Sequence, residues 1–123
     1  MINSIIFING IYDLICGFTI LFFSSNVYLK PIANLHPMIF KEEFRNDLIK
    51  RLLAYWIITY GIIRTAVIFK NNCIFIMIII SYFIEILAYS NENYFYKTTD
   101  NNKVLWRNGL SFLIIFLFIH NNN

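Results

Sequence analysis

The stretch AYWIITYGIIRTAVIF, residues 54–69, is mostly apolar, yet it carries a permanently charged side chain, Arg64, near its middle. A run of this kind is typical of a helix inside a lipid bilayer, where an unpaired charge costs from about 2.5 to more than 10 kcal/mol. Because arginine does not lose its proton in proteins, Arg64 needs a partner of opposite charge or a route to water. This one residue therefore constrains how the rest of the chain folds.

The composition of the whole chain is that of a membrane protein. Of its 123 residues, 59% are hydrophobic and 14% are charged. An average soluble domain has about 45–50% apolar and about 25% charged residues. The net charge of +3 comes from basic residues that flank the apolar segments, so it gives no indication of nucleic-acid binding.

Four apolar segments, separated by polar breaks, predict an all-α integral membrane protein. A bilayer core of about 30 Å requires about 20 helical residues. The expected spans cover residues 3–25, 52–69, 73–89 and 105–119. We expect them to form one four-helix bundle, a single transmembrane domain over residues 1–123.

The basic residues predict the orientation of these spans. Eight of the ten Lys and Arg residues lie in the two longer connections. They are Lys30, Lys41, Arg45, Lys50, Arg51, Lys97, Lys103 and Arg107. By the positive-inside rule, both connections face the cytoplasm and both termini lie on the non-cytoplasmic side.

The first connection contains an amphipathic pattern. In MIFKEEFRNDLIKRLL, residues 38–53, an apolar side chain recurs every fourth residue at Phe40, Phe44, Leu48 and Leu52. This period predicts a short amphipathic helix before the second span. It is expected to lie on the membrane surface or to extend the second span into solvent.

Depth along the helices favours Asp13 as the partner of Arg64. At 1.5 Å per residue, Asp13 lies about 15 Å from the membrane surface near the termini, Arg64 about 8 Å and Glu85 about 20 Å. The first two depths differ by less than the length of an arginine side chain, so we expect Asp13 to pair with Arg64. Glu85 is expected to lie too far along the axis for direct contact.

Polar side chains on shared helix faces define a candidate site. Its members are Asn9, Asp13, Tyr60, Arg64 and Glu85. We expect two tyrosines, Tyr12 and Tyr60, to cover Arg64. Glycines in the first two spans are expected to let those helices approach closely; they are Gly10, Gly17 and Gly61. Three interpretations stay open: a clamp that fixes packing, a site for a ligand, proton or ion, and extension of the charged side chains to opposite surfaces.

Patterns typical of catalysis or metal binding are not found in the sequence. His36 and His120 are predicted on opposite sides of the membrane, which excludes a shared metal site. Cys16 and Cys73 are predicted at different depths, so no disulfide is expected between them. There is no phosphate-binding glycine loop, no G-x-S-x-G and no H-E-x-x-H motif. We therefore expect no cofactor and no enzymatic activity.

The second span carries a spaced motif. RLLAYWIITYGIIR places Arg51, Trp56 and Arg64 in the spacing R-x4-W-x7-R. In this stretch the chain resembles the ergosterol-biosynthesis scaffold family, small four-span proteins of the endoplasmic reticulum. SYFIEILAYSNE, residues 81–92, is similar in character to that family's third span, which closes on a glutamate; either Glu85 or Glu92 occupies that place.

The resemblance implies a non-catalytic protein of the endoplasmic reticulum that holds partner enzymes together. The expected partners are the lipid bilayer and other membrane proteins or further copies of this chain. The alternative is a small carrier or channel that uses Asp13, Arg64 and Glu85 as a polar site. Four short spans leave little room for alternating access without oligomerisation, which favours the scaffold.

Overall fold

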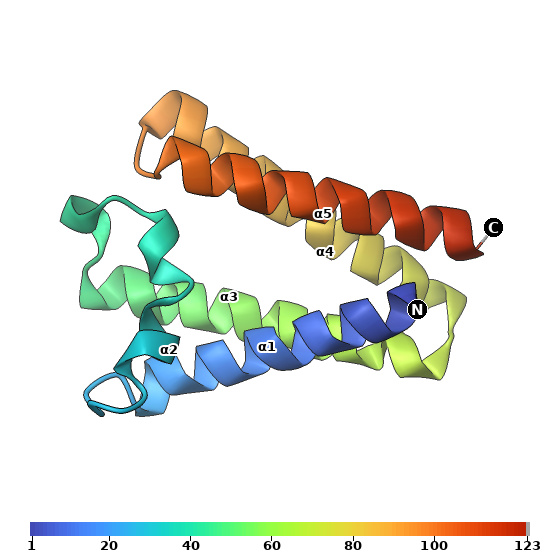
Figure 1. Cartoon of the computed structure of the whole chain (residues 1–123), viewed down its shortest axis with the longest axis horizontal. Helices are drawn as coiled ribbons and strands as arrows, with labels where there is room; N and C mark the ends of the chain where they lie inside the picture. The colour runs from blue at the N-terminus through green and yellow to red at the C-terminus, as the bar shows by residue number, and fades with distance from the viewer. Residues whose placement is uncertain (123) are drawn as a thin grey trace.

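A computed structural model, which describes residues 1–122, folds the chain into four long helices (Figure 1). They are α1 (Ile2–Phe22), α3 (Asp47–Thr65), α4 (Asn72–Asn91) and α5 (Asn101–Asn122). Each is long and apolar enough to cross a membrane once its flanking turns are included. The prediction of an all-α four-helix membrane protein is therefore confirmed.

Short turns lengthen two of these helices. The 3-10 turn Ala66–Phe69 continues α3, and the π-helical turn Glu92–Tyr96 continues α4. Each turn ends on a lysine with positive φ, 49° at Lys70 and 55° at Lys97. This left-handed conformation is unfavourable for a residue that carries a Cβ. The helical part of the third span therefore runs beyond residue 89, where the sequence placed its end.

The four helices form two pairs. α1 packs along α3, and α4 packs along α5 (Figure 1). The pairs lie close together at the end that holds both termini, and they diverge toward the opposite end. Both termini therefore lie at the same end of the bundle, as an even number of spans requires.

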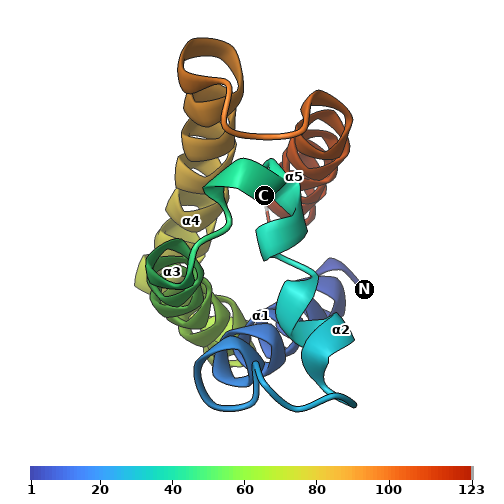
Figure 2. The same ribbon diagram turned by 90° about the vertical axis from the view of Figure 1, so that its left-hand side faces the viewer.

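The connection between α1 and α3 lies between the two pairs at the diverging end (Figure 2). It contains α2 (Lys30–Asn34) and the 3-10 turns Pro37–Ile39 and Glu42–Phe44. Ala33 packs against the α1–α3 pair, while Ile39 packs against Tyr89 of α4 and Val104 of α5. The connection thus joins the two pairs through two apolar clusters, and Phe40 packs against both of them.

The amphipathic helix expected over residues 38–53 does not form as one piece. The backbone is extended at Phe40, which makes an isolated bridge to Thr99. Arg45 Nε donates to the carbonyl of Phe40 at 2.8 Å, and the side chain of Asn46 caps the start of α3. Because these side chains bond to nearby backbone groups, they replace the hydrogen bonds that a continuous helix would make. Separate helical turns therefore precede the second span.

α1 and α3 approach each other closely at the three glycines that the sequence singles out. A Cβ on Gly61 would lie 2.7 Å from Leu14 Cγ and 2.9 Å from the backbone oxygen of Gly10. A Cβ on Gly17 would collide with Ile58. Residues without side chains are what allow two helix backbones to lie this near.

Gly61→Ala should lower the melting temperature of the detergent-solubilised protein. The added methyl group meets the backbone of Gly10, which moves only if α1 and α3 separate, and overpacking of this kind costs about 1–3 kcal/mol. Gly109→Ala is the matched control, because nothing lies within 4 Å of a Cβ at Gly109. That variant should keep or raise the melting temperature, since alanine is favoured over glycine in helices by up to about 1 kcal/mol. Circular dichroism on heating measures both, and equal melting temperatures would contradict the close packing.

Candidate functional site

Arg64 lies at the centre of a cluster of charged side chains inside the bundle. Its side chain is 2% exposed, on the inner face of α3. Nη1 donates to Asp13 Oδ2 of α1 at 2.7 Å, and Nη2 donates to Glu85 Oε2 of α4 at 2.5 Å. Nε donates to Ser81 Oγ at 3.3 Å. One guanidinium therefore links three helices.

Two tyrosine rings lie against this guanidinium. The Arg64 Cζ atom is 3.8 Å from the ring centroid of Tyr82 and 5.1 Å from that of Tyr60. Contacts between a cation and an aromatic ring stabilise by about 2 kcal/mol when both are desolvated. Asn9 Nδ2 donates to Tyr82 Oη at 3.0 Å and so supports the closer ring.

The cluster also reaches α5 and the connection between α1 and α3. Arg107 Nη1 of α5 lies 3.9 Å from Glu85 Oε1, and His36 Nε2 lies 3.2 Å from Asp13 Oδ1. All four long helices and the connection therefore contribute a side chain. The two carboxylates and two guanidiniums have formal charges that cancel, which limits the electrostatic penalty of burying them.

The surroundings of His36 favour its neutral form. Burial lowers the pKa of His36 from its ordinary value of 6.5, and the hydrogen bond to Asp13 opposes this shift. A neutral imidazole that donates from Nε2 to Asp13 leaves Nδ1 as an acceptor. Nδ1 has no partner within residues 1–122, and the ring packs against Tyr12 with centroids 5.2 Å apart. In this neutral form His36 donates to Asp13 and helps to orient that carboxylate.

The geometry agrees with one expected contact of Arg64 and contradicts another. The contact between Asp13 and Arg64 is present, whereas the expectation that Glu85 lies too far away is wrong. The expectation counted Cα positions, but side chains in a helix lean toward its N-terminus. Because α3 and α4 run in opposite directions, Arg64 and Glu85 lean toward each other and meet. They therefore do not extend to opposite surfaces of the bundle.

One of the two expected aromatic neighbours is replaced by another. Tyr60 does lie against Arg64, but Tyr12 packs on His36 instead. Tyr82, one residue after Ser81 on α4, provides the nearer ring.

Two members of the cluster, His36 and Arg107, are missing from the sequence-based prediction. Arg107 follows the buried Val104 by three residues and precedes the buried Ser111 by four, so the helical period places it toward the bundle. Counting Arg107 as a cytoplasmic loop residue hid that signal. His36 lies in an irregular connection just before Pro37, where no period indicates which residues are buried.

The cluster suits the joining of helices better than metal binding. Both carboxylates are directed at guanidinium groups, and within residues 1–122 no three His, Cys, Asp or Glu side chains are grouped to hold a metal ion. The two cysteines are free thiols, Cys16 buried and Cys73 exposed.

These contacts define a small all-α membrane protein whose four helices are joined through a buried, charge-balanced cluster. The family model described as Erg28 like protein matches residues 4–118. The match covers most of the chain, so the protein belongs to this family, the ergosterol-biosynthesis scaffold family that its second span resembles. No curated protein and no solved structure matches the chain.

Two of the three spaced residues that carry the resemblance, Trp56 and Arg64, lie in or beside the cluster, whereas Arg51 is exposed at the start of α3. Trp56 and Arg64 lie two turns apart on α3, and the Trp56 ring packs against Tyr89 with centroids 5.4 Å apart. Of the two candidate glutamates, Glu85 contacts Arg64, whereas Glu92 accepts a hydrogen bond within the connection that follows α4. The contact with Arg64 therefore favours Glu85, rather than Glu92, as the counterpart of the glutamate in the family's third span.

Arg64→Leu should strongly destabilise the protein, because it leaves buried carboxylates without a counter-charge. Removing one member of a buried ion pair costs about 3–5 kcal/mol. The double variant with Asp13→Leu should recover much of this loss, since Glu85 keeps Arg107 at 3.9 Å and the formal charges balance again.

Thermal unfolding in detergent measures both variants, with Arg51→Leu on the exposed start of α3 as the control. An Arg64→Leu protein that melts with the wild type would contradict the role of the cluster in stability. So would a double variant no more stable than the single one.

Proposed function

We propose that this protein is a non-catalytic scaffold that holds partner proteins together within a membrane. The observation that carries the proposal is that the charged side chains inside the bundle bind one another. Asp13, Arg64 and Glu85 each have an opposite charge within 2.7 Å. General acid–base catalysis needs a titratable group within reach of a substrate proton, whereas these groups are paired and buried. Membership of the Erg28 like family supports the same conclusion.

In this proposal the candidate site is a clamp that fixes the packing of the helices. Its members are Asn9, Asp13, Tyr60, Arg64 and Glu85. Each contact described above joins side chains from different helices or supports such a contact. A scaffold needs this rigidity because it must keep its outer surfaces at fixed positions relative to one another.

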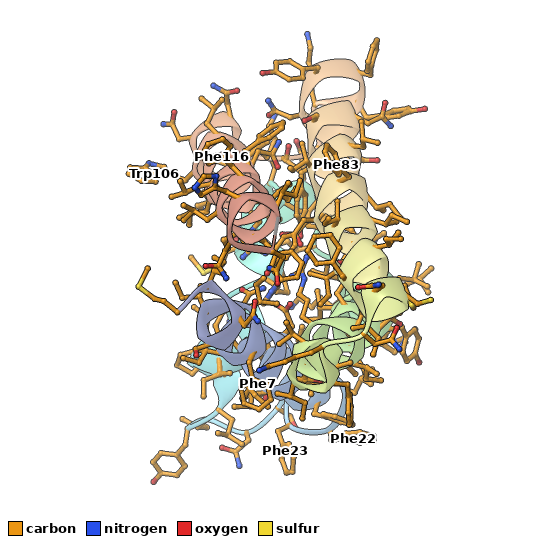
Figure 3. All side chains as sticks on the ribbon, turned by 90° about the vertical axis from the view of Figure 1, so that its right-hand side faces the viewer. Phe7, Phe22, Phe23, Phe83, Trp106 and Phe116 are labelled. Carbon is orange, nitrogen blue, oxygen red and sulfur yellow. The ribbon has the colours of Figure 1, made fainter. Side chains whose placement is uncertain are left out.

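The outer face of α5 is the surface that we propose for a partner. In the most apolar 18-residue stretch of α5, 22% of the residues are buried, against 33–39% in the corresponding stretches of the other three spans. Figure 3 shows Trp106 projecting away from the bundle. A shallow groove of 370 Å³ runs over Gly109 between apolar side chains, namely Leu105, Trp106, Leu110 and Leu113. Because a residue without a side chain lets a second helix approach, the groove fits one transmembrane helix of a partner protein.

A photo-crosslinking amino acid at Leu110 should capture a membrane protein in native membranes. The same probe at Leu87, a leucine on α4 that is at least as exposed as Leu110, is the control and should capture lipid. Gly109→Leu should abolish the protein adduct from Leu110, because it fills the groove while its Cβ lies in open space. Capture of lipid alone from Leu110, or equal protein capture from Leu87, would contradict this assignment.

We also propose that both termini lie on the lumenal, non-cytoplasmic side of the endoplasmic reticulum membrane. Seven of the ten basic residues support this orientation, because they lie at the end of the bundle opposite the termini or in the connections there. They are Lys30, Lys41, Arg45, Lys50, Arg51, Lys97 and Lys103. The family to which the chain belongs supports the choice of membrane.

The native thiol of Cys73 reports this orientation, since it is exposed at the start of α4, near the termini. In sealed vesicles from the endoplasmic reticulum with the cytoplasmic face outward, a membrane-impermeant maleimide should label it only after detergent is added. Cys73→Ser controls for reaction at the buried Cys16. Labelling of intact vesicles would reverse the proposed topology.

A further inference from the structure

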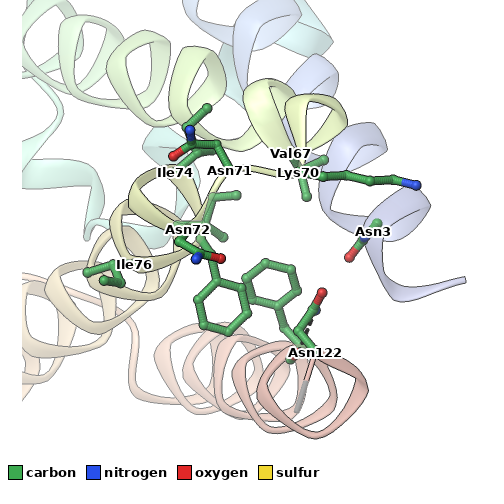
Figure 4. A pocket seen from close by; sticks show the side chains of 11 residues that line it. Asn3, Val67, Lys70, Asn71, Asn72, Ile74, Ile76 and Asn122 are labelled. Carbon is green, nitrogen blue, oxygen red and sulfur yellow. Dashed lines mark hydrogen bonds between the residues drawn. The ribbon is translucent and has the colours of Figure 1, made fainter.

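A pocket with a volume of 550 Å³ opens at the end of the bundle that holds both termini (Figure 4). It lies between the start of α1, the turn from α3 to α4, and the end of α5. Its polar lining consists of one lysine and four amides, which are Lys70, Asn3, Asn71, Asn72 and Asn122. No residue of the charge cluster takes part, so the pocket is a separate feature of the molecule.

The polar side of this pocket lies over an apolar base. The rings of Phe75 and Phe118 stack with centroids 4.6 Å apart, and Ile78 beside them is fully buried. All four spans begin or end at this level, so in a bilayer we expect the pocket to lie near the boundary between the hydrocarbon core and the lipid headgroups. The lining of the pocket changes from polar to apolar in the same direction, from the headgroups toward the hydrocarbon core.

The charge of the pocket favours an anion. Lys70 is the one charged side chain in its lining, and it has no ion-pair partner within the described part of the chain. All seven Asp and Glu residues lie between residues 13 and 100, and none of them lines the pocket. An uncompensated lysine beside a recess raises the local concentration of anions.

Unused hydrogen-bonding groups also point into this region. The first turn of a helix has backbone N–H groups with no intrahelical acceptor, and the first turn of α4 forms one wall of the pocket. Asn71 Oδ1 accepts from Cys73 N and satisfies one of them. Asn3 Oδ1 is buried without a partner within residues 1–122. The pocket therefore offers donors for an oxyanion and one acceptor for a hydroxyl group.

We propose that this pocket binds a phosphate group that carries hydroxyl groups nearby, as an anionic phospholipid headgroup does. The phosphate oxygens bind Lys70 and the amide groups, a headgroup hydroxyl donates to Asn3, and an acyl chain lies over Phe75. This lipid-binding activity is independent of the scaffold function, since it needs no partner protein.

Short-chain phosphatidylglycerol should raise the melting temperature of the full-length protein in detergent, and the dependence on concentration gives an apparent affinity. Phosphatidylcholine, which has no net charge and no headgroup hydroxyl, should bind at least about tenfold more weakly. Lys70→Gln should weaken phosphatidylglycerol binding about five- to tenfold, as expected for loss of a charge-assisted hydrogen bond. Asn3→Leu should weaken it as well.

Lys97→Gln is the matched control. Lys97 is also an exposed lysine with positive φ at the end of a helical turn, but it lies at the other end of the bundle. This variant should bind phosphatidylglycerol as the wild type does. An equal loss of affinity in Lys97→Gln and Lys70→Gln, or none in either, would overturn the proposal.

Inorganic phosphate distinguishes the two sources of the oxyanion. A response to phosphatidylglycerol alone supports a lipid headgroup as the ligand. A response to inorganic phosphate at the same concentration, lost in Lys70→Gln, supports the oxyanion site with free phosphate as its ligand. No response to either compound would overturn the site itself.

Discussion

The two ion pairs of Arg64 are the interaction on which the rest of the structure depends. Asp13 belongs to the α1–α3 pair and Glu85 to the α4–α5 pair, so a single guanidinium joins both halves of the bundle. In hydrocarbon an unpaired carboxylate or guanidinium is strongly unfavourable, so separating the halves would expose charges on each side. The glycines serve this arrangement, because Gly10 and Gly17 flank Asp13 and bring α1 close enough to α3 for the contact.

The diverging end of the bundle follows from the same constraint. Arg64 holds the helices together through polar contacts, but beyond the cluster the two pairs separate and leave apolar side chains such as Leu53 and Tyr89 to cover. The connection between α1 and α3 covers them with Ile39 and Ala33, and it brings His36 to Asp13. A neutral histidine is suited to this place, because it donates a hydrogen bond without disturbing the charge balance of the cluster. The connection is thus part of the core, unlike most surface loops.

The parts of the fold that depend on the length, apolarity and spacing of residues along the chain could be predicted from the sequence. The positions of the spans follow from their length and apolarity. The contact between Asp13 and Arg64 follows from comparing the depths of the two residues along their helices. Glu85 was misplaced because rise along the axis omits the direction in which side chains lean. The helix predicted over residues 38–53 does not form as one piece, although its amphipathic pattern is present. Hydrogen bonds from side chains to the backbone replace those of a continuous helix. The burial of His36 could not be predicted, because it lies in an irregular connection without a helical period.

α5 is attached to the bundle differently from the other three helices, and this difference links the cluster to the proposed scaffold. Its contribution to the cluster, Arg107, lies 3.9 Å from Glu85, whereas the contacts of Arg64 are 2.7 and 2.5 Å. Its buried face is narrow, built on Val104, Ser111 and Ile115 and continued by Phe118. The short contacts of Arg64 therefore join α1, α3 and α4, whereas α5 is held mainly by its apolar face. A smaller share of α5 than of the other spans is buried, which is why we propose its outer apolar face as the surface for another protein.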